Sequence, residues 1–313
     1  MHKVNAFILA AGMGERLRPL TQLFPKPLIP VLGQPLLWHI LKKIEQTAAE
    51  QIGINTYYQS QLLQQWVTTT APAITKPIQL FPEDPHLGSG GGLKNAASLL
   101  EQGDFVVYNG DIFSDFDLNA FIAYHQASSH IATFAIMQQA PVPQVKSNML
   151  LNTGGQVIGV NAPWDTQAVS QSVAFAGVAV YSPQIFDFLP TGYSSVLAAW
   201  ESAFKAGFTL GTWDIGAQSL WYDVGTPQAY AALVKTLLQD GQYVDATATL
   251  ADDIELQGWM AIEQHAVIGS GTKLKNCIVL PNTEIAADSH WENAIMGPAV
   301  LVHIKPDSHK GRL

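Results

Sequence analysis

Short apolar runs alternate along the first half of the chain with segments in which apolar residues recur at helical spacing. The runs that predict buried strands are Ala6–Ala10, Ile52–Tyr57, Ile78–Phe81, Phe105–Tyr108 and Ile131–Met137. The segments that predict helices are Pro35–Gln46, Gln61–Val67, Gly92–Leu100 and Leu118–His125. Because strands that alternate with helices usually pair in parallel, the pattern predicts a Rossmann-like α/β fold with a doubly wound, mostly parallel sheet.

Between Met149 and Val180 the pattern changes to short strands that are separated by glycines such as Gly154, Gly155 and Gly159. This change predicts an antiparallel excursion at the edge of the sheet that covers the ligand site. Further helices are predicted at Pro183–Leu189, Ser195–Ala206 and Gln228–Leu238. Since the Asp-Gly pair at 240–241 ends the last helix, the first predicted domain spans residues 1–240.

The tail, residues 245–313, contains an internal repeat. Residues 268–281 align with 285–298 at an offset of 17, and apolar residues recur near every sixth position. This period predicts a left-handed parallel β-helix of about two coils, with a pair of similar hairpins as the alternative. Two coils have open ends, so we expect the tail to pack on the first domain or on a second subunit in a homo-oligomer, and to serve stability or assembly.

Composition narrows the functional classes. Of 313 residues, 48% are apolar and 13% are charged, which predicts a large core and little disorder. The net charge of −9 argues against a nucleic-acid partner. The single Cys277 excludes an intrachain disulfide, and no run is long enough for a membrane span, so we expect a cytoplasmic protein. The first apolar run breaks at Gly12 and therefore predicts a strand rather than a signal peptide.

A glycine-containing loop follows the first predicted strand, and residues 9–31 read LAAGMGERLRPLTQLFPKPLIPV. Gly12 and Gly14 let backbone N–H groups approach phosphate oxygens, at the strand end where α/β sheets bind ligands. Positive charge for a polyphosphate comes from Arg16, Arg18 and Lys26. The spacing fits neither the dinucleotide fingerprint nor the P-loop. The alternative to a nucleoside triphosphate site is an ordinary turn with surface arginines.

This segment resembles the signature of the sugar-1-phosphate nucleotidyltransferases, LAAGxGxRLxPLT followed by PKPLIPV. The resemblance implies an enzyme that joins a nucleoside triphosphate to a sugar 1-phosphate and releases pyrophosphate. It also implies that Arg16 and Lys26 stabilise the leaving pyrophosphate. The implied nucleotide contacts around this loop are Leu9, Ala10, Ala11, Gly12, Gly14 and Gly110.

Two aspartates follow predicted strands and suit Mg²⁺, which binds one or two carboxylates beside substrate phosphates and water. Asp111 follows a strand and a glycine, and Asp223 lies in the run Asp-Val-Gly-Thr-Pro. Taken singly, either could be a turn or cap residue. The resemblance implies that both are the family's metal ligands and, with Arg16 and Lys26, the catalytic residues. Asp214 lies in a similar run but lacks the Thr-Pro that begins a helix, so we exclude it.

A second glycine cluster, residues 82–92, reads PEDPHLGSGGG. The resemblance implies that the backbone around Gly88, Ser89 and Gly90 reads the nucleobase and that Glu83 contributes. The alternative is a strand-to-helix loop in which glycines permit tight turns. A helix that begins near Gly92 would direct its N-terminal dipole at a phosphate.

The resemblance assigns the sugar to Gly177, in an Ala-Gly motif, and to Asn148. Here the chain also departs from the family, because many relatives have Glu-Lys-Pro where residues 161–163 are Asn-Ala-Pro. The lysine that holds the sugar phosphate in those relatives is therefore missing. Lys146 is one substitute, and a solvated loop lysine is the alternative for it.

Within the family, the GGG loop, residues 109–117 and the Phe-Ala-Gly run most resemble N-acetylmuramate-1-phosphate uridylyltransferases. A β-helix tail is commoner among mannose-1-phosphate guanylyltransferases. The substrates expected are therefore UTP with N-acetylmuramate 1-phosphate, or GTP with mannose 1-phosphate. The missing lysine favours an alternative, a non-catalytic sugar-nucleotide-binding regulatory subunit. The presence of Arg16, Lys26 and both aspartates argues against it, and two coils are too few for an acyltransferase site.

Overall fold

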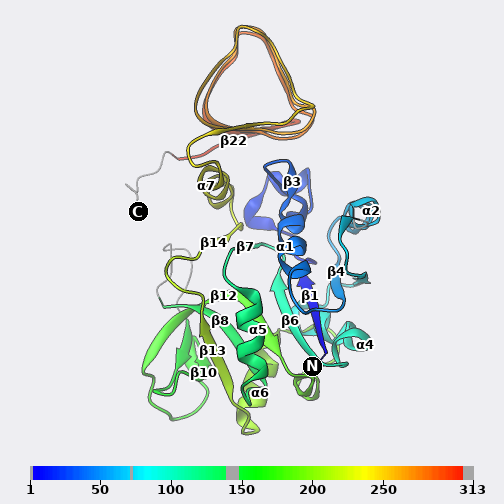
Figure 1. Ribbon diagram of the computed structural model, residues 1–313, viewed down its shortest axis with the longest axis vertical. Coiled ribbons are helices and arrows are strands. Elements are labelled where there is room, and N and C mark those ends of the chain that lie inside the picture. The colour runs from blue at the N-terminus through cyan, green and yellow to red at the C-terminus, as the bar shows by residue number, and fades with distance from the viewer. Residues whose placement is uncertain (1–2, 71–72, 139–147, 306–313) are drawn as a thin grey trace. The chain divides into compact units, whose positions relative to one another are not determined.

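The computed structural model describes residues 3–70, 73–138 and 148–305 (Figure 1). The chain forms two compact units. The first combines Met1–Gly12 with Ile40–Trp221, and the second combines Met13–His39 with Tyr222–Leu313. The segment that carries Gly14, Arg16 and Lys26 thus belongs to the same unit as the C-terminal region, although more than 180 residues separate them in sequence.

The first unit is built on one sheet. Among the described residues the sheet has ten strands, and its central part has the order β6-β1-β4-β5 with all pairs parallel. These strands are β1 Val4–Leu9, β4 Ile52–Thr56, β5 Ile78–Pro82 and β6 Asp104–Asn109. The first four apolar runs predicted as strands form this part, and the fifth, Ile131–Met137, forms β8 elsewhere in the sheet. The prediction of an α/β fold with a mostly parallel central sheet is therefore confirmed.

The rest of the sheet continues from β6 through the long strand β12. These further strands are β8 Ala132–Met137, β9 Met149–Leu151, β10 Val157–Val160, β11 Ala162–Pro163, β12 Gln171–Tyr181 and β13 Leu210–Asp214, with β7 Ile112–Ser114 outside this sheet. The pairs β12-β6, β12-β8, β12-β9, β9-β10 and β10-β11 are antiparallel. The predicted antiparallel excursion is therefore a continuation of the main sheet.

Helices alternate with these strands along the chain, and two of them begin at side-chain caps. The helices are α1 Leu36–Glu45, α2 Ser60–Thr70, α3 Gly88–Asn95, α4 Ala97–Leu100, α5 Leu118–Gln126 and α6 Val196–Lys205, with a 3₁₀ turn at Pro183–Asp187. Asp117 caps α5 and Ser195 caps α6 through their side-chain oxygens. In the part of the chain that the structure describes, every helix is too short or too polar to cross a bilayer.

Helix α3 begins four residues before the predicted start at Gly92. Glycine has a low helix propensity, so the local sequence favours a loop there. In the structure, Gly90 N donates to Ser194 O at 2.9 Å, and a Cβ at Gly91 would clash with the carbonyl of Gly192. Close packing against residues 192–195 therefore makes this glycine-rich segment helical.

The second unit begins with three short 3₁₀ turns, Glu15–Leu17, Leu20–Gln22 and Lys26–Leu28. A small hairpin follows, β2 Pro30–Val31 with β3 Gln34–Pro35. Asp223 ends β14 Trp221–Asp223, and α7 Pro227–Leu238 comes next. Thr226 caps α7 and Pro227 occupies its first turn, where a missing N–H costs nothing.

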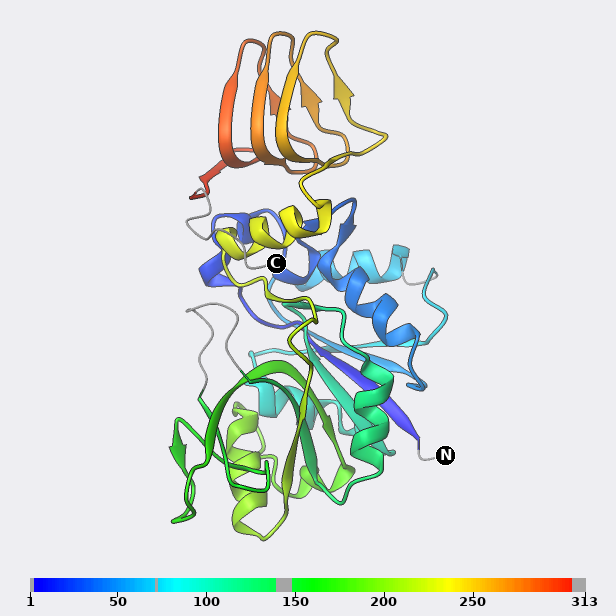
Figure 2. The ribbon, with the colours of Figure 1, turned by 60° about the vertical axis from the view of Figure 1, so that its left-hand side comes forward.

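The C-terminal strands stack as parallel layers. They are β15 Gln242–Val244, β16 Thr249–Leu250, β17 Glu255–Ile262, β18 Val267–Ile268, β19 Lys273–Val279, β20 Glu284–Ile285 and β21 His290–Gly297, closed by the antiparallel β22 Val300–His303. Figure 1 shows their triangular path, and Figure 2 the stacked layers. Ile268 pairs with Ile285 and Ile278 with Ile295, which is the register of the 17-residue repeat.

Strand β17 adds a layer before the repeat that the sequence revealed. It pairs in parallel with β19, but the register shifts between Gln257 and Met260. Strand β17 has one residue more than β19 at this shift. The period between the two strands therefore changes, which is why the 17-residue sequence repeat does not extend to β17. The interior of the stack is apolar, with Met260, Ile262, Leu274 and Cys277 buried.

Candidate functional site

In the first unit, the ends of β1 and β6 bring part of the predicted nucleotide loop beside Asp111. Leu9 pairs with Asn109, and Gly110 N donates to Leu9 O at 2.9 Å. A Cβ at Gly110 would lie 2.8 Å from Leu9 O, so a larger residue would push the two segments apart. The residues Leu9 to Gly12 therefore leave the sheet next to Gly110 and Asp111, as expected for a ligand site at strand ends.

A buried asparagine that the sequence analysis missed links this loop to the second glycine cluster. Asn55 Oδ1 accepts from Ala10 N at 2.6 Å, and Asn55 Nδ2 donates to Glu83 Oε1 at 2.7 Å. Glu83 Oε2 in turn accepts from Leu87 N at 2.8 Å. The signal that could have identified Asn55 is its amide at the end of the buried run Ile52–Ile54, where a polar group needs partners.

The glycines of α3 have mainly packing roles in the structure. A Cβ at Gly92 would lie 2.8 Å from Glu83 Oε1 and 2.9 Å from Asn55 Nδ2, so glycine leaves room for that pair. Ser89 Oγ accepts from Val196 N at 3.0 Å, and the Gly90 amide is used by Ser194. Both carboxylate oxygens of Glu83 also accept hydrogen bonds within the protein. A nucleobase contact by Glu83, Ser89 or Gly90 would therefore have to use polar atoms other than the Gly90 amide, or hydrogen-bonding capacity that remains on the Ser89 and Glu83 oxygens.

Of the residues predicted for the sugar, Gly177 lies inside strand β12, where its register with β8 shifts, and Asn148 directly precedes β9. Gly177 has a φ of +76°, and a Cβ there would lie 2.6 Å from Ile112 Cγ1. Asn148 Nδ2 donates to Asn161 Oδ1 at 3.1 Å, and Asn161 N donates to Asn148 O at 2.7 Å. Asn148 thus contacts the segment in which the family's lysine is missing. Lys146 lies outside the described residues.

In the second unit, the predicted phosphate-binding residues come together around one carboxylate. Arg16 Nη2 lies 3.5 Å from Asp223 Oδ2, and Lys26 Nζ lies 3.9 Å from Asp223 Oδ1. Gly14 has a φ of +62°, and a Cβ there would lie 3.1 Å from Lys26 Cβ. A Cβ at Gly225 would lie 2.8 Å from both Arg16 Nη2 and Asp223 Oδ1. Glycine at both positions lets the three charged side chains approach one another.

This cluster holds two positive charges and one negative charge, and the two cations differ in exposure. The Arg16 side chain is 64% exposed, so its ion pair with Asp223 contributes little to stability and leaves the guanidinium open to an incoming anion. The Lys26 side chain is only 11% exposed and is fixed by its packing. The arrangement suits a polyphosphate, which would neutralise the excess positive charge.

The metal prediction depends on Asp111 and Asp223, one in each unit. Over residues 3–70, 73–138 and 148–305, no group of three or more His, Cys, Asp or Glu side chains is placed to hold a metal ion. Mg²⁺ does not need such a group, because one or two carboxylates with phosphate oxygens and water satisfy it. The donor chemistry of the two aspartates therefore fits Mg²⁺. Asp214, excluded above, is exposed and accepts from Gly216 N in a turn.

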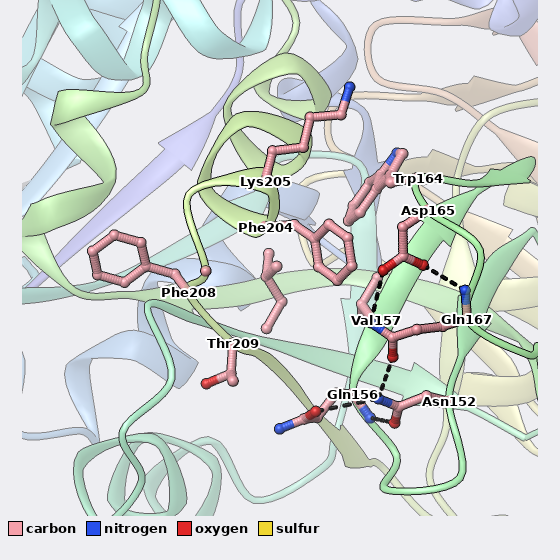
Figure 3. Close-up of a pocket in the computed structure, with 12 residues that line it drawn as sticks. Asn152, Gln156, Val157, Trp164, Asp165, Gln167, Phe204, Lys205, Phe208 and Thr209 are labelled. Atoms are coloured by element: carbon pink, nitrogen blue, oxygen red, sulfur yellow. Dashed lines mark hydrogen bonds between the residues drawn. The ribbon is translucent and has the colours of Figure 1, made fainter.

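The first unit also has an open cavity of about 420 Å³ away from these residues (Figure 3). Trp164, Phe204 and Phe208 provide its aromatic walls. Its polar groups bond to one another, since Gln167 donates to Asp165 and Asn152 donates to Gln156 and Gln167. The cavity contains none of the residues that the sequence predicts for the site.

We expect Asn55→Ala to lower both stability and triphosphate affinity. The substitution leaves Ala10 N and the buried Glu83 carboxylate without their partner, at a cost of roughly 1–3 kcal/mol for each unsatisfied group. Thermal unfolding and the KM for triphosphate measure the two effects. Asn119→Ala, at an exposed asparagine in the same unit, is the matched control. An unchanged melting temperature and KM in the Asn55 variant would show that this link is dispensable.

Comparisons with known proteins agree on one family. The family model described as nucleotidyl transferase matches residues 5–240. The chain is 32% identical over 230 residues to N-acetylmuramate alpha-1-phosphate uridylyltransferase of Neisseria meningitidis serogroup B, covering 71% of this chain and 94% of that protein. It is 26% identical over 301 residues to mannose-1-phosphate guanylyltransferase of Mycobacterium tuberculosis, covering 91% of this chain and 82% of that protein. The structure of HddC from Yersinia pseudotuberculosis superposes with a TM-score of 0.59 and 22% identity, over 76% of this chain and all of that one.

Proposed function

This chain belongs to the sugar-1-phosphate nucleotidyltransferase family, and on that premise we propose how its own residues carry out the reaction. An oxygen of the sugar 1-phosphate attacks the α-phosphorus of a nucleoside triphosphate. The bond between the α-phosphorus and its bridging oxygen to the β-phosphate breaks, and pyrophosphate leaves with the electron pair. The cluster of Arg16, Lys26 and Asp223 is the observation that best supports this assignment.

The reaction needs no side chain as a base. A phosphate monoester is largely ionised at neutral pH and is already nucleophilic, so catalysis consists of positioning and charge neutralisation. Arg16, which is exposed, neutralises charge as it develops on the leaving pyrophosphate. Lys26, which is packed against Gly14, supplies a fixed positive charge that does not need to reorganise.

Bound Mg²⁺ would supply further charge neutralisation on the phosphates, and we propose that Asp111 and Asp223 hold it. The chain's own loop supports the rest of the triphosphate. Gly12 has no heavy atom within 4 Å of where a Cβ would lie, so its backbone is open to a ligand. We place the reaction in the cytoplasm, where nucleoside triphosphates are made.

Two substrate pairs are favoured, each by a different relative. The relative at 32% identity is an N-acetylmuramate alpha-1-phosphate uridylyltransferase, which favours UTP with that sugar phosphate. The guanylyltransferase relative extends over 91% of this chain, which favours GTP with mannose 1-phosphate as the second pair. We further propose that the C-terminal layers are a left-handed β-helix, for which the 17-residue parallel register is the support.

We expect pyrophosphate release to depend on both a triphosphate and a sugar 1-phosphate. The test is a screen of four nucleoside triphosphates against N-acetylmuramate, mannose and glucose 1-phosphates with MgCl₂, followed by a coupled phosphate assay. Release with one pair well above all others would identify the substrates. If no pair releases pyrophosphate while calorimetry detects binding of a nucleotide-sugar, the chain is instead a regulatory subunit.

A further inference from the structure

Glu263 occupies an unusual position in the C-terminal stack of strands. It directly follows Ile262, which pairs with Val279, and Val279 pairs with Met296. The residues at the position of Glu263 in the next two layers are therefore Leu280 and Gly297. Glu263 is fully buried, as is Leu280. Burying a carboxyl group where the neighbouring layer has leucine costs free energy unless the carboxyl group is hydrogen-bonded or paired.

The partner of Glu263 is the turn at Leu32–Gly33. This turn directly follows residues 9–31, which are called the signature segment below. Glu263 Oε2 accepts from Gly33 N at 2.9 Å, and Gln264 Nε2 donates to Gly33 O at 2.9 Å. Two consecutive side chains of the tail thus hold both polar atoms of one residue. Gly33 has a φ of +82°, and a Cβ there would clash with the hydroxyl of Tyr243, so the turn accommodates only glycine.

The turn is connected to Lys26 by a short segment with several backbone hydrogen bonds. Ile29 N donates to Lys26 O at 3.2 Å, and Leu36 N donates to Ile29 O at 3.0 Å. Tyr230 of α7 donates its hydroxyl to Pro30 O at 2.5 Å. The residues from Lys26 to Gly33 are therefore held between α7, which begins just after Asp223, and the tail.

The next layers of the stack also contact the signature segment. A Cβ at Gly297 would lie 2.8 Å from Leu23 Cδ1, so glycine at this position lets the stack approach Leu23 closely. The position that holds Glu263 in one layer thus contacts the signature segment two layers later as well.

The surroundings of Glu263 raise its pKa. The titratable groups that influence it are Asp245 and Tyr243 from the tail and Tyr230 from α7, and no ion pair joins it to a described lysine, arginine or histidine. Burial is the largest effect and raises the pKa of Glu263 to about 7. The Gly33 and Leu32 amides lower that pKa, and Asp245 raises it further.

We infer that Glu263 is a positioning residue for nucleotidyl transfer, which fixes the Leu32–Gly33 turn and through it the segment that carries Arg16 and Lys26. This inference rests on the proposed function. It gives the tail a part in the reaction, whereas the sequence alone suggests only stability or assembly. Glu263 itself need not touch the substrate.

Two variants separate the hydrogen bond from the charge. Glu263→Gln keeps an acceptor for Gly33 N without the charge, and Glu263→Leu introduces the residue that the next layer has at this position. We expect Glu263→Leu to lower kcat or raise the KM for triphosphate by about 10-fold or more, because small displacements of binding groups have large effects. We expect Glu263→Gln to restore activity to within about 3-fold of the parent, since most of a neutral hydrogen bond is retained. Glu284→Gln, at an exposed glutamate of the same stack, is the matched control.

Hydrogen exchange gives a readout that does not depend on turnover. Peptides that span residues 26–36 should exchange faster in Glu263→Leu than in the parent or in Glu263→Gln. If the parent releases no pyrophosphate with any substrate pair, the proposed function fails while this measurement still tests the role of Glu263. Equal exchange and equal kinetics in parent and Glu263→Leu would overturn the inference, as would lost stability in that variant with unchanged kinetics.

The pH dependence of stability is a further measurement, and it tests the ionisation of the buried Glu263 carboxyl group. A pKa raised in the folded state means that the folded protein binds the proton more tightly than the unfolded chain does. The stability that the protonated Glu263 gives the folded protein is fully present below about pH 4.5, the ordinary pKa of the group. It is lost as the pH rises through about 7. We therefore expect the melting temperature of Glu263→Gln to exceed that of the parent by a margin that grows from pH 5 to pH 8. A constant margin would contradict the position assigned to Glu263.

Discussion

Asp223→Asn and Asp111→Asn are each expected to lower kcat by at least about 10²-fold while the fold is kept, because each removes a charge from the proposed metal site. Asn is close in shape to Asp, so the melting temperature should remain near that of the parent. For Asp223 there is a second reason, since its carboxylate lies within 4 Å of both Arg16 and Lys26 and orients them. Turnover against MgCl₂ concentration, together with thermal unfolding, measures the effect.

Asp214→Asn is the matched control for the Asp223 variant. Asp214 lies in a similar Trp-Asp-Ile-Gly run, is exposed and accepts a hydrogen bond from Gly216 N in its own turn. We expect this variant to keep its activity. Normal Mg²⁺-dependent turnover in both Asp111→Asn and Asp223→Asn would remove the basis for the metal assignment.

Arg16→Ala is expected to lower kcat/KM by about 10²-fold, through a contact that strengthens as charge develops on the pyrophosphate. The exposed guanidinium has only a weak ion pair in the structure, so its loss should not change the melting temperature. Steady-state kinetics at several triphosphate concentrations separates the effect on KM from that on kcat. A reduced kcat identifies a contact made in the transition state, whereas a raised KM alone identifies uniform binding.

Lys205→Ala is the control here, because Lys205 is also an exposed cation with a carboxylate partner, Glu201, and lies outside the predicted site. Arg16→Lys tests whether charge alone suffices, since lysine cannot reproduce the bidentate geometry of a guanidinium. If Arg16→Ala binds and converts triphosphate as the parent does, the loop has only a structural role.

The signature segment and the C-terminal region belong to the same compact unit. Arg16 and Lys26 belong to a segment that packs with α7 and with the C-terminal strands, and that segment is continuous in sequence with β1 of the other unit. Its geometry thus depends on contacts such as Tyr230 with Pro30 and Glu263 with Gly33. Variants in the tail can therefore change turnover without altering a residue of the first unit.

Local sequence determined the parts of the fold that depend on local physics. The apolar run before Gly12 and the Thr-Pro pair at 226–227 predict a strand and a helix start that the structure contains, and the 17-residue repeat is the register in which β19 pairs with β21. Strand burial, helix capping and stacking of identical layers act over a few residues or one period, so the sequence records them directly.

Tertiary structure decided what depends on residues far apart in the chain. Gly88 to Gly92 form a helix because residues 192–195 pack on them, and Asn55 is a partner for Ala10 only because β4 lies beside β1. Glu263 meets Gly33 across 230 positions, which no local pattern encodes. A polar residue within an apolar run indicates from the sequence that a hydrogen-bond partner is needed. Which residue is that partner depends on the packing of the chain.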